Sequence, residues 1–133
     1  MDKKLLKIAK QQRKRCCFCG KKMILQRSII VHAPQLILSL ATYEHKIPKS
    51  QGGTRSYENG VASCLECNGK RGLIDFDTFI KIRGDHVLWL KFEKMRWKFY
   101  KKMKRKRKDE FCWREFNTSF YDYFLSKDSL INI

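Results

Sequence analysis

The chain has 133 residues, of which 43% are hydrophobic, a composition that favours one modest globular core with room for an appended arm. It carries 30 Lys and Arg residues against 13 Asp and Glu residues, a formal net charge of +17. The longest stretch without a charged residue, 28–43, is too short and too polar for a membrane span, and Lys7 interrupts the N-terminal apolar cluster, so no secretory signal is expected. These features predict an intracellular, cytoplasmic protein, in which paired cysteines indicate metal ligands rather than disulfides.

The first half of the chain is predicted to contain both helices and strands. Good helix formers begin the chain, and the stretch that follows the first cysteines is rich in Ile, Val, Leu and Thr. In chain order the expected elements are a helix over 1–13, a tight turn over 16–20, strands within 24–43 broken at 33–35 and running into 44–45, a loop over 49–60, a strand over 61–64 and a helix over 65–73.

The second half is predicted to be helical. Apolar residues recur at spacings of four, three, four and four at Leu88, Phe92, Met95, Phe99 and Met103. This period indicates one face of a helix over 85–108, with Gly84-Asp85 as the break and N-cap before it. A second row with a spacing of four, 116, 120 and 124, predicts another helix in the acidic tail.

The predicted fold is therefore α+β, with a small ββα centre and helices added at both ends. We expect residues 1–76 to form the core domain and residues 77–133 to form a basic, then acidic, helical extension that packs on it. Charge follows the same division. Net charge is +9 over 1–30, zero over 31–80, +11 over 81–108 and −3 over 109–133. Two basic blocks that flank a neutral centre are expected when the centre does chemistry and the flanks hold a polyanion.

Two Cys-x-x-Cys pairs lie 44 residues apart, one at Cys16 and Cys19 and the other at Cys64 and Cys67. Structural zinc takes four thiolates in a tetrahedron, and each such pair places two thiolates on one ion. The four cysteines predict a zinc ion that staples the centre. Cys17 would offer a poorer spacing to the metal, and Cys112 is expected to be a buried thiol on the tail helix.

Between the two cysteine pairs lies a second group of residues. It consists of Glu44-His45-x-Ile47-Pro48, Gly52-Gly53-Thr54, Glu58-Asn59-Gly60-Val61 and, overlapping the second pair, Cys64-x-x-Cys67-Asn68. In this order, these pieces resemble the HNH endonuclease family, also called ββα-metal or His-Me finger nucleases. The resemblance covers about residues 13–74 and corresponds to the His-Asn-Asn version of the motif. Glu44 stands where Asp is commoner in the family.

The resemblance implies four functional residues. His45 would be the general base that deprotonates water, a role that suits an imidazole near neutral pH. Glu44 and Asn68 would bind a catalytic Mg²⁺ or Mn²⁺, which prefers such oxygen ligands. Asn59 would brace the loop and orient His45, although an Asn in a turn is commonly structural alone.

These observations favour a metal-dependent HNH endonuclease that hydrolyses phosphodiester bonds in DNA, most simply double-stranded DNA. Homing, restriction and phage-type genome processing are all consistent with it, and a protein partner is compatible as well. The alternative is a non-catalytic, zinc-stabilised module that binds nucleic acid within a larger complex.

The basic run after residue 90 is predicted to hold phosphates, with calmodulin-like or acidic-lipid binding as the competing interpretation of a basic amphipathic helix. Its aromatic residues, Trp89, Trp97, Phe99 and Tyr100, follow the helical period and are expected to be core rather than base-stacking platforms. The candidate nucleic-acid contacts are Arg55, Lys70, Arg71, Lys98, Lys101, Lys102, Lys104, Arg105, Lys106, Arg107 and Lys108.

Overall fold

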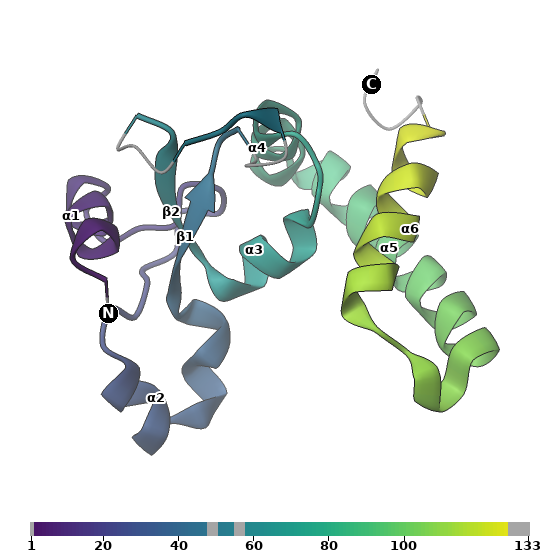
Figure 1. The fold of residues 1–133 in the computed structure, drawn as a ribbon, viewed down its shortest axis with the longest axis horizontal. Helices are drawn as coiled ribbons and strands as arrows, with labels where there is room; N and C mark the ends of the chain where they lie inside the picture. The colour runs from purple at the N-terminus through teal and green to yellow at the C-terminus, as the bar shows by residue number, and fades with distance from the viewer. Residues whose placement is uncertain (1, 48–50, 55–57, 128–133) are drawn as a thin grey trace. The chain divides into compact units, whose positions relative to one another are not determined.

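The computed structural model describes residues 2–47, 51–54 and 58–127. The chain divides into two compact units, Met1–Arg71 and Gly72–Ile133 (Figure 1). The division falls directly after the last helix of the first unit, whereas the sequence places the boundary after residue 76. Within the described residues, no helix is both long enough and apolar enough to cross a membrane.

The first unit is built around two antiparallel strands. Its elements are α1 (Lys3–Gln11), α2 (Arg27–His32), the 3₁₀ helix η1 (Pro34–Ser39), β1 (Ala41–His45), β2 (Gly60–Cys64) and α3 (Leu65–Arg71). β1 and β2 pair from Ala41 opposite Cys64 to His45 opposite Gly60. In Figure 1, α1 lies to one side of the strand pair and α3 to the other. This mixed unit confirms the predicted ββα centre.

Helix α1 falls within the stretch 1–13 that is predicted to be helical. The Asp2 side chain accepts hydrogen bonds from the backbone N–H groups of Lys4 and Leu5, at 2.7 and 3.2 Å, and so caps the first turn. Leu5, Ile8 and Ala9 are buried on one face. Just beyond the helix, the Gln12 amide exchanges two hydrogen bonds of 2.9 Å with the backbone N–H and C=O of Ala62 in β2.

The prediction of strands within 24–43 is wrong for most of this stretch, which α2 and η1 occupy. It is correct only from Ala41 onwards, where β1 begins. Pro34 lies in the first turn of η1, where its fixed φ suits a helix start and its missing N–H is not needed. No residue of α2 or η1 is buried, and Val31 is 75% exposed. β-Branched residues favour strands only where they can pack on a sheet, and this stretch has no such surface. Ile24 alone pairs with the β1 edge, where its C=O accepts from Ala41 N–H at 2.9 Å.

The second unit is helical, with α4 (Phe76–Gly84), α5 (His86–Arg107), the 3₁₀ turn η3 (Lys108–Glu110) and α6 (Trp113–Leu125). The long basic helix and the tail helix are confirmed. Asp85 caps α5 as predicted, since its carboxylate accepts from the N–H groups of Val87 and Leu88 at 3.0 and 3.1 Å. The core of this unit is aromatic, and its most completely buried side chains are Phe79, Phe92, Phe116 and Phe124.

Two features of the second unit differ from the prediction. Helix α4 was not predicted, although Asp75 accepts from Thr78 N–H at 3.2 Å as an N-cap, and Phe79 and Ile82 are buried one turn apart. Cys112 is exposed and occupies the N-cap position of α6, so it is not a buried thiol on the tail helix. The apolar row that buries α6 consists of phenylalanines at 116, 120 and 124, and residue 112 precedes the helix that carries it.

Candidate functional site

The four predicted zinc ligands converge in the first unit. The sulfur atoms of Cys16, Cys19, Cys64 and Cys67 all lie within 4.8 Å of one another, and Cys19 and Cys64 are 3.9 Å apart. Thiolates at about 2.3 Å from a tetrahedral zinc ion are separated by roughly 3.8 Å. The cluster therefore fits a structural zinc ion. Cys17 is not one of its members.

In each cysteine pair, a backbone N–H group points to the sulfur atom of the first cysteine. The N–H of Phe18 points to the sulfur of Cys16, and the N–H of Cys67 points to the sulfur of Cys64, each at 3.4 Å. After the first pair, Gly20 has a φ of +76°, which closes the turn and lets its N–H donate to the Cys16 C=O at 3.0 Å. Amide donors aimed at sulfur stabilise thiolates, which are the form that binds metal.

The thiols of this cluster perturb one another. Hydrogen bonds from Cys17, Cys64 and Cys67 hold the pKa of Cys16 below its ordinary value. The hydrogen bond to Cys16 raises the pKa of Cys64 to about 11, and burial contributes to the increase. These mutual effects follow from the close approach of the four cluster sulfur atoms, which lie within 4.8 Å of one another.

The residues of the motif meet where β1 faces α3. Successive strand residues point to opposite faces, so Thr42 and Glu44 share one face of β1. The Thr42 hydroxyl accepts from the Asn68 side-chain amide at 3.0 Å. Glu44 accepts from the guanidinium of Arg71, one turn further along α3, also at 3.0 Å. The structure thus brings Glu44 and Asn68 to one interface within the first unit.

Arg71 lies inside the unit, not on the surface where the sequence predicted a phosphate contact. Its side chain is 4% exposed, and the same Nη1 that binds Glu44 also donates to the His45 backbone C=O at 3.1 Å. The guanidinium lies over the Phe18 ring, 5.9 Å from its centroid. A buried carboxylate beside it explains the placement, because a buried charge requires a partner.

Burial raises the pKa of Glu44 to about 7, although the charge and hydrogen bond of Arg71 act to lower it. Desolvation therefore outweighs the ion pair at this carboxylate, whose side chain is 13% exposed. Glu44 loses its proton only near neutral pH unless a further cation comes close to it.

We expect the stability of the protein to fall as the pH rises from about 4.5 to about 7 through the contribution of Glu44. Its pKa is higher in the folded chain than the ordinary value of 4.5, so the folded state binds more protons in this window. The difference corresponds to at most roughly 3 kcal/mol. Urea denaturation without added Mg²⁺ or Mn²⁺, at several pH values, should show this loss in the wild type relative to Glu44→Gln. Parallel pH profiles of the two proteins would contradict the assignment.

Asn59 is buried and ties together the two ends of the loop that joins the strands. Its side-chain oxygen accepts from Ile47 N–H at 2.8 Å, and its side-chain nitrogen donates to the C=O groups of Ile47 and Thr54 at 3.0 and 2.6 Å. The Asn59 C=O accepts from Lys46 N–H at 2.8 Å. These bonds hold the backbone that directly follows His45 and are those that a bracing residue requires.

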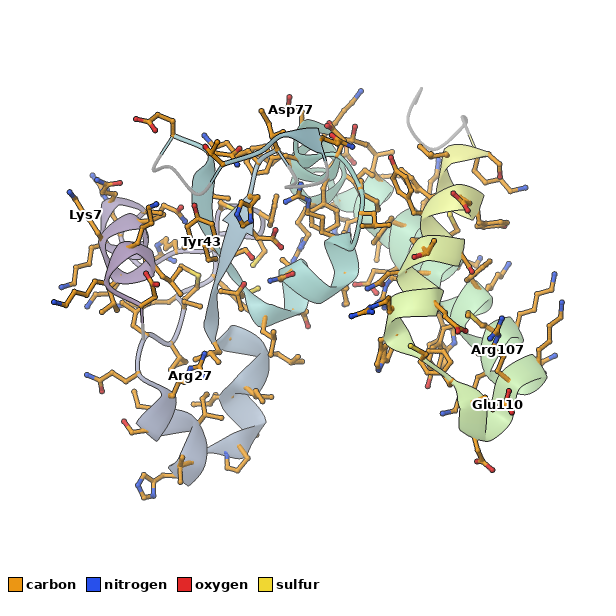
Figure 2. All side chains as sticks on the ribbon, viewed as in Figure 1. Lys7, Arg27, Tyr43, Asp77, Arg107 and Glu110 are labelled. Carbon is orange, nitrogen blue, oxygen red and sulfur yellow. The ribbon has the colours of Figure 1, made fainter. Side chains whose placement is uncertain are left out.

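His45 ends β1 next to the ring of Tyr43. Tyr43 is labelled on its strand in Figure 2. The two rings, at alternate positions of the strand, meet edge to face with centroids 4.9 Å apart. Opposite them, Gly60 leaves the space that the Tyr43 ring fills, since a Cβ there would come within 2.5 Å of the Tyr43 hydroxyl oxygen. Because His45 follows Glu44 directly along the strand, the two side chains leave β1 on opposite faces.

The predicted phosphate contacts are distributed over both units. Lys70 lies on α3, 4.0 Å from Glu66, and Arg55 falls outside the described residues. Most of the basic run is exposed on α5, whose final Arg107 pairs with Glu115 of α6. The exposed members on α5 are Lys98, Lys101, Lys102, Lys104, Arg105, Lys106 and Arg107, and Lys108 follows in η3.

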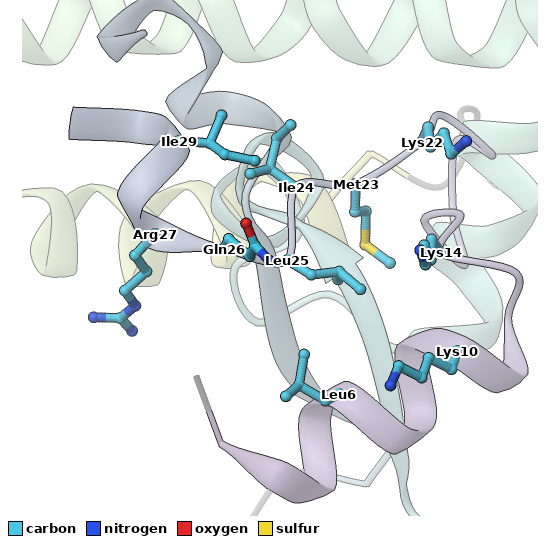
Figure 3. A pocket seen from close by; sticks show the side chains of 10 residues that line it. All are labelled: Leu6, Lys10, Lys14, Lys22, Met23, Ile24, Leu25, Gln26, Arg27 and Ile29. Atoms are coloured by element: carbon cyan, nitrogen blue, oxygen red, sulfur yellow. The ribbon is translucent and has the colours of Figure 1, made fainter. Parts of the chain in front are cut away.

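The first unit also contains a basic hollow that the residue-by-residue prediction missed. It has a volume of about 790 Å³ and lies between α1, the segment that follows the first cysteine pair, and the start of α2 (Figure 3). Its charged lining residues are Lys10, Lys14, Lys22 and Arg27, all cationic, over an apolar floor that includes Leu6 and Met23. The net charge of +9 over residues 1–30 was the available signal.

Comparison with known families agrees with this geometry. The first unit combines a two-stranded antiparallel sheet, a following helix and four clustered cysteines that fit a structural zinc ion. Residues 16–72 match the model of the HNH endonuclease family, so this part of the chain is similar to an HNH endonuclease domain. No curated protein and no solved structure matches the chain. The match begins at the first zinc-cluster cysteine and ends one residue after Arg71.

Proposed function

We propose that the protein is a metal-dependent HNH endonuclease that hydrolyses phosphodiester bonds in double-stranded DNA inside the cell. The HNH domain over residues 16–72 carries the proposal, because it indicates a nuclease-type function. The positive charge of the chain supports a polyanionic substrate.

The donor set at the β1–α3 interface fits a hard divalent cation. Glu44 supplies a carboxylate and Asn68 an amide, and both reach the interface from neighbouring positions on β1 and α3. In the proposal these two residues hold Mg²⁺ or Mn²⁺ through oxygen atoms. The cation, when bound, stabilises the negative charge that develops on the leaving 3′ oxygen.

The remaining chemistry belongs to the chain itself. In the proposal, the imidazole of His45 removes a proton from the attacking water, and a 5′-phosphate end results. Asn59 fixes the backbone after His45, and the Tyr43 ring meets the imidazole edge to face. The first contact limits movement of the backbone next to His45 and the second limits movement of its ring, which reduces the entropy lost in the transition state.

Two observations favour the alternative of a non-catalytic nucleic-acid-binding module. The first is that Glu44 and His45 leave β1 on opposite faces, so the cation ligand and the general base do not start from the same side of the strand. The second concerns Glu44 itself. The carboxylate assigned to the catalytic cation is already paired with the buried Arg71 guanidinium. A cation entering the site has to share Glu44 with that guanidinium or displace it. In a purely structural module the Glu44–Arg71 pair would simply join β1 to α3.

A plasmid-nicking assay separates the two functions. Supercoiled plasmid is incubated with the full chain in three separate reactions, which contain Mg²⁺, Mn²⁺ or EDTA. The incubation with EDTA is brief. The endonuclease produces relaxed or linear product only with the divalent cation. If wild-type protein binds the plasmid but leaves it intact with either metal, the non-catalytic function is correct.

We expect the exposed basic run to supply affinity for DNA rather than catalysis. Helix α5 has 22 residues, a length of about 33 Å, which is close to one turn of duplex DNA. Changing Lys104, Arg105, Lys106 and Arg107 together to Gln should weaken binding and flatten the dependence of log affinity on log salt, by about 0.9 for each phosphate that the variant no longer binds. Cleavage at saturating DNA should persist.

The matched control keeps the charge and changes the side chains. Lys104→Arg with Lys106→Arg should leave the salt dependence as in the wild type, because the variant keeps the same number of cations for phosphate contacts. Anisotropy titrations of a labelled duplex at several salt concentrations measure both variants. An unchanged slope in the Gln variant would mean that the run faces a partner other than DNA.

A further inference from the structure

The second unit exposes a row of three parallel aromatic rings. Trp97 stacks on Tyr100 with centroids 5.5 Å apart and 19° between planes, and Tyr100 stacks on Trp113 with centroids 5.7 Å apart and 13° between planes. Trp97 and Trp113 are 57% and 55% exposed, while Tyr100 between them is half-buried. Trp97 is therefore not the core residue that its helical period predicts.

Other side chains hold this row in place. At the α6 end, the Trp113 ring meets Phe111 and Phe116 edge to face, with centroids 4.9 and 5.4 Å away. Phe116 is itself fully buried in the core of this unit. The row therefore presents two exposed indoles from a rigid base, and rigid aromatic surface binds flat ligands at a small entropic cost.

Cations accompany the row. Lys101 Nζ lies 5.7 Å from the Trp97 ring centroid, and the Arg96 guanidinium lies 5.8 Å from the Trp113 centroid. These rings and Arg96 line a hollow of about 220 Å³, in which Glu93 is the acidic lining residue. Aromatic faces for bases, with Lys and Arg beside them for phosphates, form the combination that binds single-stranded nucleic acid.

We propose that the Trp97–Tyr100–Trp113 row is a stacking site for unpaired bases of single-stranded DNA. The choice of DNA as the ligand rests on the proposed nuclease function. The proposal adds to that function that the substrate has unpaired bases next to the duplex that α5 contacts. Every base has a flat face, so the site should tolerate any sequence.

Binding of labelled oligo(dT), without Mg²⁺ or Mn²⁺, tests the proposal independently of cleavage. Trp97→Leu should lower the affinity by between about fivefold and about a hundredfold, the range expected for one stacked base. The salt dependence of binding should stay as in the wild type, because the substitution leaves the charge unchanged. Trp97→Phe should retain part of the affinity, and a duplex of equal length should be affected less.

Trp89→Leu is the matched control on the same helix. Trp89 stacks on Phe92, with centroids 5.4 Å apart, and the Arg83 guanidinium lies 4.2 Å from its ring centroid, so it belongs to the packing between α4 and α5. Its loss should lower the melting temperature and leave oligo(dT) affinity unchanged in the folded protein. Trp113→Leu provides a second variant of the row itself.

Three results would overturn the proposal. The first is wild-type affinity for oligo(dT) in both Trp97→Leu and Trp113→Leu. The second is an equal loss on single strands and duplex, which would make the row a general DNA contact. The third is the absence of any quenching of tryptophan fluorescence by oligo(dT), which would assign the exposed rings to a protein partner.

Discussion

Cys64→Ser is expected to abolish metal binding and to unfold the first unit. The wild-type protein should contain about one zinc ion per chain, since four sulfur atoms lie within 4.8 Å of one another. Structural zinc contributes roughly 10–16 kcal/mol in small domains, which equals or exceeds the typical stability of a whole domain, about 5–15 kcal/mol. Loss of one buried ligand should therefore remove the cooperative transition of this unit. Elemental analysis and thermal melting measure the two effects.

Two other cysteines provide matched controls for that variant. Cys17 lies between the two cysteines of the first pair but is not part of the metal cluster, and Cys112 is exposed. The control variants are Cys17→Ser and Cys112→Ser. Both proteins should keep one zinc ion and melt close to the wild type. A protein that contains no zinc as purified and melts unchanged after strong chelation would end the zinc assignment, whatever the variants do.

His45→Ala is expected to reduce DNA cleavage by about a hundredfold to ten-thousandfold, the usual contribution of a positioned general base. Binding of DNA should change little, because a base acts in the transition state and adds little to ground-state affinity. The fold should survive as well, since the edge-to-face contact with Tyr43 is worth about 0.5–1.5 kcal/mol. Cleavage rates at saturating plasmid measure the effect.

His32→Ala is the control for that experiment, because this histidine is exposed at the end of α2 and lies outside the motif. It should cleave as the wild type does. Asn68→Ala should raise the metal concentration required as well as lower the rate, in keeping with its proposed place beside the cation. Equal cleavage by the wild type and His45→Ala would assign the activity to another site or to a contaminant.

The features that are predicted correctly from the sequence depend on residues that lie close together along the chain. The cysteine pairs, the strand that ends at His45, the Asp85 cap and the spacing of apolar residues on α5 each involve a few neighbouring residues with one dominant physical cause. Such patterns specify local geometry directly. They also placed the HNH motif, which the family match over residues 16–72 confirms.

The features that sequence missed depend on tertiary surroundings. The apolar stretch before β1 has the composition of a strand, yet it forms helices because no sheet surface is offered to it. The burial of Arg71 against Glu44 joins residues 27 positions apart, and nothing in a Lys-Arg dipeptide distinguishes an interior guanidinium from a surface one. Trp97 lies on α5 but is not among its buried residues, Leu88, Phe92 and Met103, and 57% of it is exposed.

The bonds of Gln12 and Ile24 have a consequence for solution behaviour. A sheet of two strands has an outer edge on each strand, and exposed edges recruit strands from other chains and promote aggregation. At Ala62 of β2 the Gln12 amide occupies both backbone groups, and at Ala41 of β1 the Ile24 carbonyl takes the outward N–H. At these two positions, the Gln12 side chain and the backbone hydrogen bond of Ile24 thus take the places that additional strands would occupy. Intermolecular β-pairing there would first have to displace Gln12 or Ile24.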